Sequence, residues 1–291
     1  MTKLRSVAIC GAHTTLGKAL REKMRRMGVE TVDVRSSDLK LPAPSLAERI
    51  AGVDGVFNLE GEPYVARWGG RYEFDIYRSH QMSVRSLGNA LRFADPRPGF
   101  FITLSNAMVY DKFEVHDEYS NAYGDTFMAE VGQMETAEAM RIVKQYEGLR
   151  LIIARAGYLM SKDGGAFPLW SAFSRIGWGG RIDEGYQCIP MIHIDDAVAA
   201  LAFLAENNSA NGVYNLTIPE MASMNELVKA FATTLSRSQH RLPKFVIRLM
   251  AGRAVKLLEQ NCKVVPKRLS DSGFSFAYPN VDVIVSSLQD S

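Results

Sequence analysis

The residues with the clearest chemical potential form a glycine-rich loop near the start of the chain, Gly11-Ala12-His13-Thr14-Thr15-Leu16-Gly17. The loop follows an apolar run and precedes a helical pattern, so the free N–H groups of the helix would face an anion. Gly11 suits the tight turn of a dinucleotide fold and Gly17 suits close packing of helix on strand. The middle position, where backbone approaches phosphate, is Thr14, whose hydroxyl could itself bond a phosphate oxygen. The residues that we assign to a dinucleotide here are Gly11, His13, Thr14, Thr15, Leu16 and Gly17. The alternative is a fold of this type that has lost its ligand.

The end of the second predicted strand indicates which dinucleotide would fit. An acidic residue there accepts hydrogen bonds from the ribose 2′-OH of NAD, whereas an arginine suits the 2′-phosphate of NADP. Arg35 takes this place, followed by the hydroxyls of Ser36 and Ser37. We therefore predict NADP as the cofactor, with Arg35 and Ser36 at the phosphate. Asp33 on the same strand face keeps NAD possible, and a plain surface charge is the alternative role for Arg35.

The elements that position this loop alternate short apolar strands with helical patterns. Strands are predicted at residues 6–10, 31–34, 55–59, 100–104, 149–154, 189–193 and 213–216. Helices are predicted at 16–27, 74–93, 126–146, 195–205 and 223–235, and a short helix opens at residues 44–48. Two S-x-x-E matches, at Ser45 and Ser223, predict capping boxes. Such alternation implies βαβ units and a parallel sheet covered on both faces. The fold class is therefore α/β, a Rossmann-type doubly wound parallel sheet, followed by a smaller, mainly helical C-terminal part that the family resemblance described below implies is a substrate lobe.

Composition narrows the classes of partner. The chain has 291 residues, is 47% hydrophobic and carries a formal net charge of +2. It can bury a full core, and it has no overall field that would steer it to nucleic acid or an anionic membrane. One segment departs from this balance, because residues 241–268 hold eight basic residues against one acidic residue. That segment is the solvated face of helices, a basic wall beside an anionic ligand, or a surface for an anionic macromolecule.

The cysteines, histidines and apolar runs of the sequence indicate whether a metal site is expected and in which compartment the protein works. The three cysteines form no CxxC, and the five histidines show no pair at metal-ligand spacing, so no metal site is expected. The apolar run after Arg5 is too short for a signal peptide, and the longest apolar run, residues 197–205, falls far below the ~18 residues that span a bilayer. We expect a soluble, cytoplasmic protein without a membrane or nucleic-acid partner.

Further segments carry a family resemblance. They are Val56-Phe-Asn-Leu-Glu-Gly61, Arg67-Trp68, Ser105 to Tyr110, Phe127-Met-Ala-Glu-Val131, Arg155-Ala-Gly157, Ile192-His-Ile-Asp-Asp196 and Val265-Pro-Lys-Arg-Leu269. The chain resembles the NAD-dependent epimerase/dehydratase family, the extended branch of the short-chain dehydrogenase/reductases. Within it, the chain is similar to a sugar-nucleotide-epimerase-like subgroup that has its own C-terminal domain.

The resemblance implies a division of the chain and further site residues. It implies an NAD(P)-binding Rossmann domain over residues 1–240 and a family-specific C-terminal module over residues 241–291. The residues that it places along the cofactor are Asn58, Leu59, Glu60 and Gly61. Those that it places beside the substrate are Arg67, Trp68 and His193.

The catalytic residues of the wider superfamily are absent. A Tyr-x-x-x-Lys pair usually transfers the proton, but the aligned positions hold Met128 and Gly132. The string from Tyr158 to Lys162 follows a strand, where positions four apart are roughly 13 Å distant, so it does not replace the pair. The remaining acid–base candidates follow the fourth predicted strand: Ser105 to hold a carbonyl and Tyr110 to donate a proton, with Asn106 and Tyr123 nearby. Packing with a satisfied hydroxyl is the alternative for each tyrosine.

These observations lead to two expectations of function. The first is an NADP-preferring oxidoreductase or epimerase-like enzyme acting on a small hydroxyl- or carbonyl-bearing substrate, which could be anionic, without the usual Tyr–Lys pair. The second is a catalytically silent NAD(P)-binding sensor or scaffold. The partner expected is a small-molecule substrate, and a homodimer is left open.

Overall fold

The centre of the molecule is a six-stranded sheet in the order β10-β6-β4-β3-β1-β2, in which every neighbouring pair is parallel. The computed structural model describes residues 3–146, 148–177, 179, 184–240, 248–249 and 251–289. The strands of the sheet are β1 (Ser6–Cys10), β2 (Glu30–Val34), β3 (Gly55–Asn58), β4 (Phe100–Asn106), β6 (Arg150–Ala156) and β10 (Gly212–Leu216). Because β1 lies between β2 and β3, the strand order reverses at its carboxyl end, where α/β sheets bind ligands.

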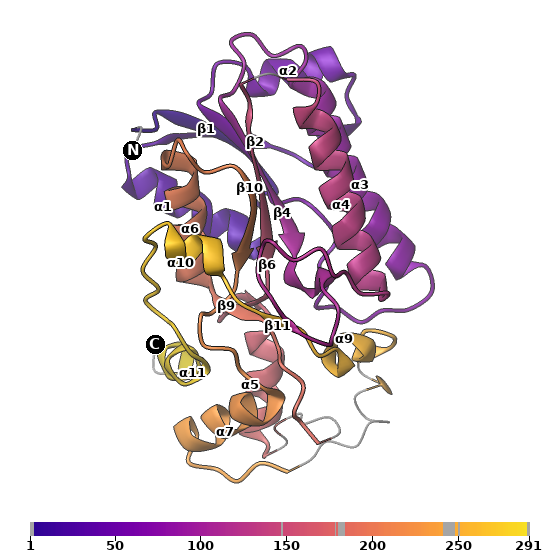
Figure 1. The fold of residues 1–291 in the computed structure, drawn as a ribbon, viewed down its shortest axis with the longest axis vertical. Helices are drawn as coiled ribbons and strands as arrows, with labels where there is room; N and C mark the ends of the chain where they lie inside the picture. Colours follow the sequence, from indigo (N-terminus) through magenta and orange to yellow (C-terminus); the bar gives the residue numbers. More distant parts are fainter. Residues whose placement is uncertain are drawn as a thin grey trace.

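Helices cover both faces of the sheet (Figure 1). In β1, Val7 and Ile9 join the apolar cluster that contains α1 (Thr15–Arg26) and α6 (Ile194–Glu206). Their neighbours Ala8 and Cys10 join the opposite cluster. That face is covered by α2 (Ala43–Ile50), α3 (Tyr72–Ala90) and α4 (Phe127–Val143). Side chains therefore alternate between two cores, as in a doubly wound fold, and the predicted fold class is confirmed.

Smaller elements gather beyond the carboxyl ends of the strands (Figure 1). They are β5 (Val115–His116), β7 (Tyr158–Ser161), β8 (Gly164–Gly165), β9 (Met191–His193), β11 (Lys263–Val264), α5 (Phe167–Arg175), α7 (Met224–Thr234), α9 (Val255–Glu259) and α11 (Val281–Gln289), with the short turn η2 (Ala107–Val109). The helix α10 (Lys267–Asp271) lies instead against the start of β10, and the turn η1 (Asp38–Lys40) follows β2. The strands β8, β7 and β9 form a second sheet, and β5 pairs with β11. An apolar cluster that includes Trp170, Phe231 and Ile284 packs these elements together.

Two predicted capping boxes have different outcomes. Ser223 caps α7 and Glu226 returns the hydrogen bond, so this box is confirmed. The match at Ser45 is wrong, because α2 begins at Ala43 after Pro42 and has no side-chain cap. Pro44 explains the earlier start, since a proline fits the first turn of a helix, where its missing N–H removes no bond.

The described part of the basic segment holds the C-terminal residues against the large sheet. Arg253 pairs with Glu73 at 2.6 Å, and the guanidinium of Arg268 donates to the carbonyl oxygens of Val213 and Asn211 at 2.7 and 2.8 Å. Arg241 and Lys244, which also belong to the predicted segment, lie outside the described residues. The helices predicted here include α9 and α10, but the strand β11 between them was not predicted. Two arginines of the segment thus serve docking within the chain.

Among the described residues, no helix combines the length and the apolar character needed to cross a membrane. Over the same ranges, no three His, Cys, Asp or Glu side chains come together in a way that could hold a metal ion.

Candidate cofactor groove and adjoining cavity

The glycine-rich loop needs both of its glycines. Gly11 has φ +85°, and a Cβ there would lie 2.6 Å from the carbonyl carbon of Leu59, far inside contact distance. A Cβ on Gly17 would overlap the carbonyl oxygen of Gly11. With glycine at these two positions, the start of α1 lies closer to β1 and β3 than it could with any residue that has a Cβ.

Thr14 is the N-cap of α1. Its hydroxyl donates to the carbonyl oxygen of Gly11 at 2.8 Å and accepts from the N–H of Gly17 at 3.0 Å. The hydroxyl is thereby engaged within the loop, in contrast to the phosphate contact that the sequence left open. In the described chain the N–H groups of Thr15 and Leu16 have no partner, as expected in a first turn. These two groups are the ones available to an anion.

Arg35 lies exposed just after β2. Its N–H binds Asp38, while its guanidinium makes no hydrogen bond or ion pair within the described residues. Asp33, which kept NAD possible, is paired instead with Arg21 at 2.9 Å. Of these two residues, the cation is the one that stays open to a ligand.

Glu60 is the feature of the groove that a phosphate ligand would find least favourable. Its Oε1 accepts from the hydroxyl of Ser36 at 2.9 Å, and its Oε2 lies 3.7 Å from Nδ1 of His13. Oε2 is buried without a hydrogen-bond partner in the described chain. A carboxylate therefore stands between the glycine-rich loop and the end of β2, where an adenosine ribose would lie. It can accept bonds from ribose hydroxyls, but it repels phosphate.

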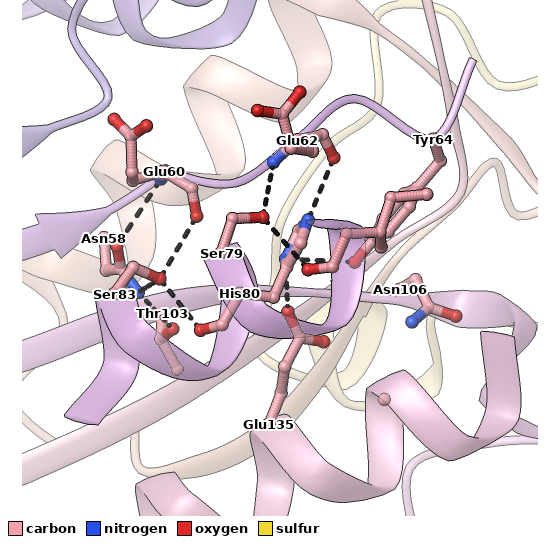
Figure 2. Close-up of polar contacts among 12 residues, drawn as sticks. Asn58, Glu60, Glu62, Tyr64, Ser79, His80, Ser83, Thr103, Asn106 and Glu135 are labelled. Carbon is pink, nitrogen blue, oxygen red and sulfur yellow. Dashed lines mark hydrogen bonds and ion pairs between the residues drawn. The ribbon is translucent and has the colours of Figure 1, made fainter. Parts of the chain in front are cut away.

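The side chain of Asn58 holds the loop after β3 in place through hydrogen bonds (Figure 2). Its buried amide donates to the hydroxyls of Ser83 and Thr103, each at 3.1 Å, and its oxygen accepts from the N–H of Glu60 at 3.4 Å. Ser83 in turn donates to the carbonyl of Glu60 at 3.2 Å. The contacts of Asn58 thus fix the backbone that follows β3.

Leu59 and Gly61 complete that backbone. The N–H of Leu59 binds the carbonyl of Cys10, which joins the loop to β1. Gly61 leaves room for the ring of His80, which a Cβ would overlap. The structure therefore brings the glycine-rich loop, the end of β2 and the loop after β3 together at the switch point of the sheet.

A cavity of about 760 Å³ adjoins this groove. Its described walls come from residues 64–67 after β3, the β7–β8 hairpin, α5 and residues 251–258. Most of these residues are apolar, and the charged ones are Arg67, Lys162 and Asp163. A Cβ on Gly164 would overlap the hydroxyl of Thr15, so the hairpin lies directly against the glycine-rich loop. Cavity and groove therefore meet at the hairpin.

Arg67 and Trp68 have different surroundings although they are neighbours. Arg67 is exposed, lines the cavity and donates to the carbonyl of Leu249 at 3.3 Å. Trp68 is buried, its indole N–H donates to the carbonyl of Tyr64 at 3.0 Å, and its backbone bonds to Ala251 and Arg253. Trp68 lines a second cavity of about 730 Å³ on the other side. Its visible role is to join the C-terminal residues to the rest of the chain.

Tyr110 lies in the seam with the C-terminal residues. Its hydroxyl donates to Oδ1 of Asn215 at 3.0 Å and accepts from Nη1 of Arg155 at 2.9 Å. Burial raises the pKa of Tyr110, and the charge of Arg155 only partly opposes this. Asn215 also donates to the carbonyl of Val265 at 3.1 Å. The geometry favours packing with a satisfied hydroxyl, the alternative that the sequence left open.

The other predicted site residues also have definite places. Ser105 shares the strand face of Thr103, toward α3 and α4, and its buried hydroxyl has no partner in the described chain. His193 is buried, stacks on Tyr278 with centroids 3.6 Å apart, and accepts at Nδ1 from the N–H of Asp195. Burial lowers the pKa of His193, so the ring is a neutral helix cap. It is not among the described residues that line either cavity.

The structure places Met128 and Gly132, the residues at the Tyr and Lys positions, on α4, and it adds a cluster that the sequence did not reveal. Met128 is buried on α4, and a Cβ on Gly132 would lie 3.0 Å from the side chain of Val109. One turn further along α4, Glu135 binds His80 of α3, and His80 stacks on Tyr64 (Figure 2). We call these three the Tyr64–His80–Glu135 cluster. The only sequence signal was a histidine within the apolar pattern of residues 74–93.

Comparisons with known proteins agree with this architecture. Residues 242–288 match the family described as Domain of unknown function (DUF1731). The chain is 30% identical over 255 residues to Epimerase family protein SSP1921 of Staphylococcus saprophyticus, covering 84% of this chain and 83% of the relative. It is 26% identical to Epimerase family protein SH2119 of Staphylococcus haemolyticus, covering 99% and 100%. Among solved structures, human epimerase family protein SDR39U1 (isoform2), crystallised with NADPH, is similar with a TM-score of 0.86 and 25% identity, covering 98% of this chain and 99% of the human chain.

Proposed function

The chain belongs to the epimerase family, with a C-terminal DUF1731 domain, and from this membership we propose that it is an NADP(H)-dependent oxidoreductase or epimerase-like enzyme. The substrate is a small carbonyl or hydroxyl compound bound in the 760 Å³ cavity. When bound, the nicotinamide supplies or accepts the hydride. The human relative crystallised with NADPH supports the choice of cofactor.

The observation that carries the cofactor assignment is that the guanidinium of Arg35 has no partner within the described residues. It lies after β2, on the same edge of the sheet as the N–H groups of Thr15 and Leu16, which also have no partner in those residues. A 2′-phosphate at Arg35 and a pyrophosphate at the helix start would each meet positive potential. The space that Gly11 and Gly17 leave permits this close approach. The residues present therefore fit a phosphorylated dinucleotide, with Glu60 as the group that must turn away or bind a ribose hydroxyl.

The cavity favours a particular kind of substrate. Its mainly apolar walls exclude water, which strengthens any polar contact made inside. Arg67 and Lys162 supply positive charge on that lining. An apolar carbonyl compound with an anionic group would satisfy both features.

A binding titration tests the cofactor assignment. NADPH and NADH fluorescence are followed as protein is added, with the wild type, Arg35→Asp and the exposed control Arg49→Asp. Arg35→Asp should weaken NADPH binding by about tenfold more than NADH binding, since one charge-assisted hydrogen bond is lost. Equal weakening of both would refute the NADP preference. Failure of the wild type to bind either nucleotide would refute the proposed function as a whole.

The second candidate is a cofactor-binding protein without turnover. It is favoured by Met128 and Gly132, neither of which can transfer a proton. This candidate predicts tight NADPH binding without consumption of NADPH when carbonyl compounds are added. Turnover that depends on residues of the cavity would refute it.

A further inference from the structure

His80 and Glu135 form a buried pair between α3 and α4 (Figure 2). Nδ1 of His80 lies 2.7 Å from Oε1 of Glu135, whose side chain is 1% exposed. Nε2 lies 3.1 Å from the carbonyl oxygen of Glu62. Glu135 is on α4, three residues after Gly132, the position at which the superfamily has its lysine. A charged pair thus occupies the region from which the usual cation is missing.

Both ring nitrogens of His80 face acceptors. The carbonyl oxygen of Glu62 can only accept, so Nε2 carries a hydrogen, and an ionised Glu135 can only accept, so Nδ1 carries one too. Burial by itself lowers the pKa of His80, but the hydrogen bond and the charge of Glu135 outweigh it, and the pKa is raised. Both contacts of the ring therefore favour its imidazolium form.

Tyr64 connects this cation to the cavity. Its ring stacks on His80 with centroids 4.7 Å apart and an interplanar angle of 13°. Its hydroxyl oxygen lies 3.1 Å from Nδ1 of His80, and the residue lines the 760 Å³ cavity. Burial, and then the charge of Glu135, raise the pKa of Tyr64 well above its ordinary value, so the phenol keeps its proton.

Two acceptors beside this hydroxyl are not used. Oδ1 of Asn106 and Oε2 of Glu135 are buried and have no hydrogen-bond partner in the described chain. Besides burial and the charge of Glu135, hydrogen bonding with the side chains of Asn106 and Glu135 also shifts the pKa of Tyr64. Buried acceptors without a donor are rare, so these two oxygens are the atoms near Tyr64 that a water or a substrate hydroxyl could satisfy.

We infer that Tyr64 is the catalytic proton donor of this protein, and that His80 and Glu135 are positioning residues that return a proton to it. This inference rests on the proposed function, because the hydride must come from a bound nicotinamide cofactor. It assigns to a different segment of the chain the task that the superfamily gives to its Tyr–Lys pair.

The step balances as follows for a carbonyl substrate. The hydride pair forms a C–H bond at the carbonyl carbon, and the π pair of the C=O bond moves to the oxygen. That oxygen takes the proton of the Tyr64 hydroxyl, and the phenol oxygen takes the proton on Nδ1 of His80. His80 is left neutral beside Glu135 and regains a proton from solvent before the next turnover. Alcohol oxidation follows the same steps in reverse.

The groups around His80 give the reaction a pH dependence. Glu135 faces it from α4, the Tyr64 hydroxyl and the Glu62 carbonyl face it from the loop after β3, and Glu60 contributes a more distant negative charge. All of these favour the imidazolium or leave it unchanged. Carbonyl reduction should therefore proceed at neutral pH and decline at alkaline pH, as His80 loses its proton.

The test uses the full-length protein, NADPH and three carbonyl probes: 9,10-phenanthrenequinone, 4-nitrobenzaldehyde and benzoylformate. The variants are Tyr64→Phe, His80→Gln and Glu135→Gln. The matched control is Tyr72→Phe, because the Tyr72 hydroxyl donates to the carbonyl of Pro63 and also bonds with Glu62, and it contacts neither His80 nor Glu135 within the described residues. Kd for NADPH is measured for every variant, which shows whether each one folds and binds.

Tyr64→Phe should lower kcat by about 100-fold or more at unchanged Kd, since general acid catalysis contributes 10²–10⁴-fold. His80→Gln and Glu135→Gln should lower kcat less and should move or remove the alkaline decline of the pH profile. Tyr72→Phe should behave as the wild type.

Three results would overturn the inference. They are a Tyr64→Phe variant that keeps more than half the wild-type kcat, a pH profile unchanged in His80→Gln, and a wild type that binds NADPH yet turns over none of the three probes. A wild type that does not bind NADPH overturns the proposed function first, and the titration reports that outcome separately.

Discussion

The hydroxyl of Ser36 donates a hydrogen bond to Oε1 of Glu60 over 2.9 Å, and this contact joins the end of β2 to the loop after β3 across the cofactor groove. The serine follows Arg35, the residue assigned to a 2′-phosphate. Arg35, which would attract a phosphate, therefore lies next to a residue that is bonded to Glu60, whose carboxylate would repel it. The balance between them sets how strongly an anionic cofactor is held.

Removing the charge of Glu60 should strengthen NADPH binding. Glu60→Gln keeps the size of the side chain but ends its repulsion of phosphate, and we expect NADPH affinity to rise by about fivefold, or about 1 kcal/mol. NADH, which lacks the 2′-phosphate, should gain less. Fluorescence titration at low salt measures both. Glu62→Gln, two residues along the same loop, is the control, and an unchanged ratio of NADPH to NADH affinity would contradict the prediction.

Gly17→Ala should destabilise the fold and prevent cofactor binding. The new Cβ would overlap the carbonyl oxygen of Gly11, so α1 has to move away from β1. We expect a loss of about 2–4 kcal/mol in the free energy of unfolding, typical of overpacking at a backbone contact. Urea denaturation measures it, with Gly69→Ala as control, because a Cβ at Gly69 would meet only one atom, at 3.9 Å. If Gly17→Ala were as stable as the control, the loop could move enough to accept a Cβ at this position, which would contradict the prediction.

The His80–Glu135 pair should make stability fall as pH rises. The folded-state pKa of His80 is raised above its ordinary value of 6.5, so its contribution is complete below pH 6.5 and is lost as pH rises through the folded pKa. His193, whose pKa burial lowers, acts in the opposite sense, so the comparison must be with a variant. The stability of wild type relative to His80→Gln should decline from pH 6 toward pH 9 in chemical denaturation. The exposed His240→Gln should keep the wild-type slope, and parallel curves for His80→Gln would count against a charged pair.

Glu118 should be required for docking of the C-terminal residues. Its Oε1 accepts from the N–H of Asn215 at 2.9 Å and its Oε2 from the N–H of Arg268 at 3.0 Å. Glu118→Gln sets an amide N–H₂ against one of these donors, and a buried N–H without its acceptor costs about 1–3 kcal/mol. Denaturation of this variant beside the exposed Glu114→Gln measures the loss. Equal stability of the two variants would mean that water replaces the carboxylate.

All six strands of the large sheet could be predicted from the sequence, because most of them are short apolar runs that alternate with helical patterns. The glycine-rich loop was found for the same reason, since its spacing is local. The capping box at Ser45 failed although its pattern was correct, because the preceding Pro42 and the favourable position of Pro44 start the helix earlier. The capping-box pattern and the two prolines predict different start points for this helix, and the structure follows the prolines.

The contacts made between distant segments could not be predicted from the sequence. Each of β5 and β11 has two residues, too few for any periodicity, and they pair only because the whole chain has folded. Tyr64 and His80 are 16 residues apart, and His80 and Glu135 are 55 apart, so no spacing rule links them. The same holds for the hydroxyl of Thr14, whose choice between helix and ligand depends on loop geometry. Such contacts follow from tertiary packing alone.

The two bonds of Glu118 also bear on the order in which the chain acquires its structure during synthesis. The donors to its two carboxylate oxygens, the N–H groups of Asn215 and Arg268, lie 97 and 150 residues later in the chain. A chain made from its N-terminus has most of the large sheet available before Arg268 leaves the ribosome. The loop between β4 and α4 therefore completes its hydrogen bonds only after Arg268 has been made, and chains that stop before Arg268 leave Oε2 of Glu118 without this donor.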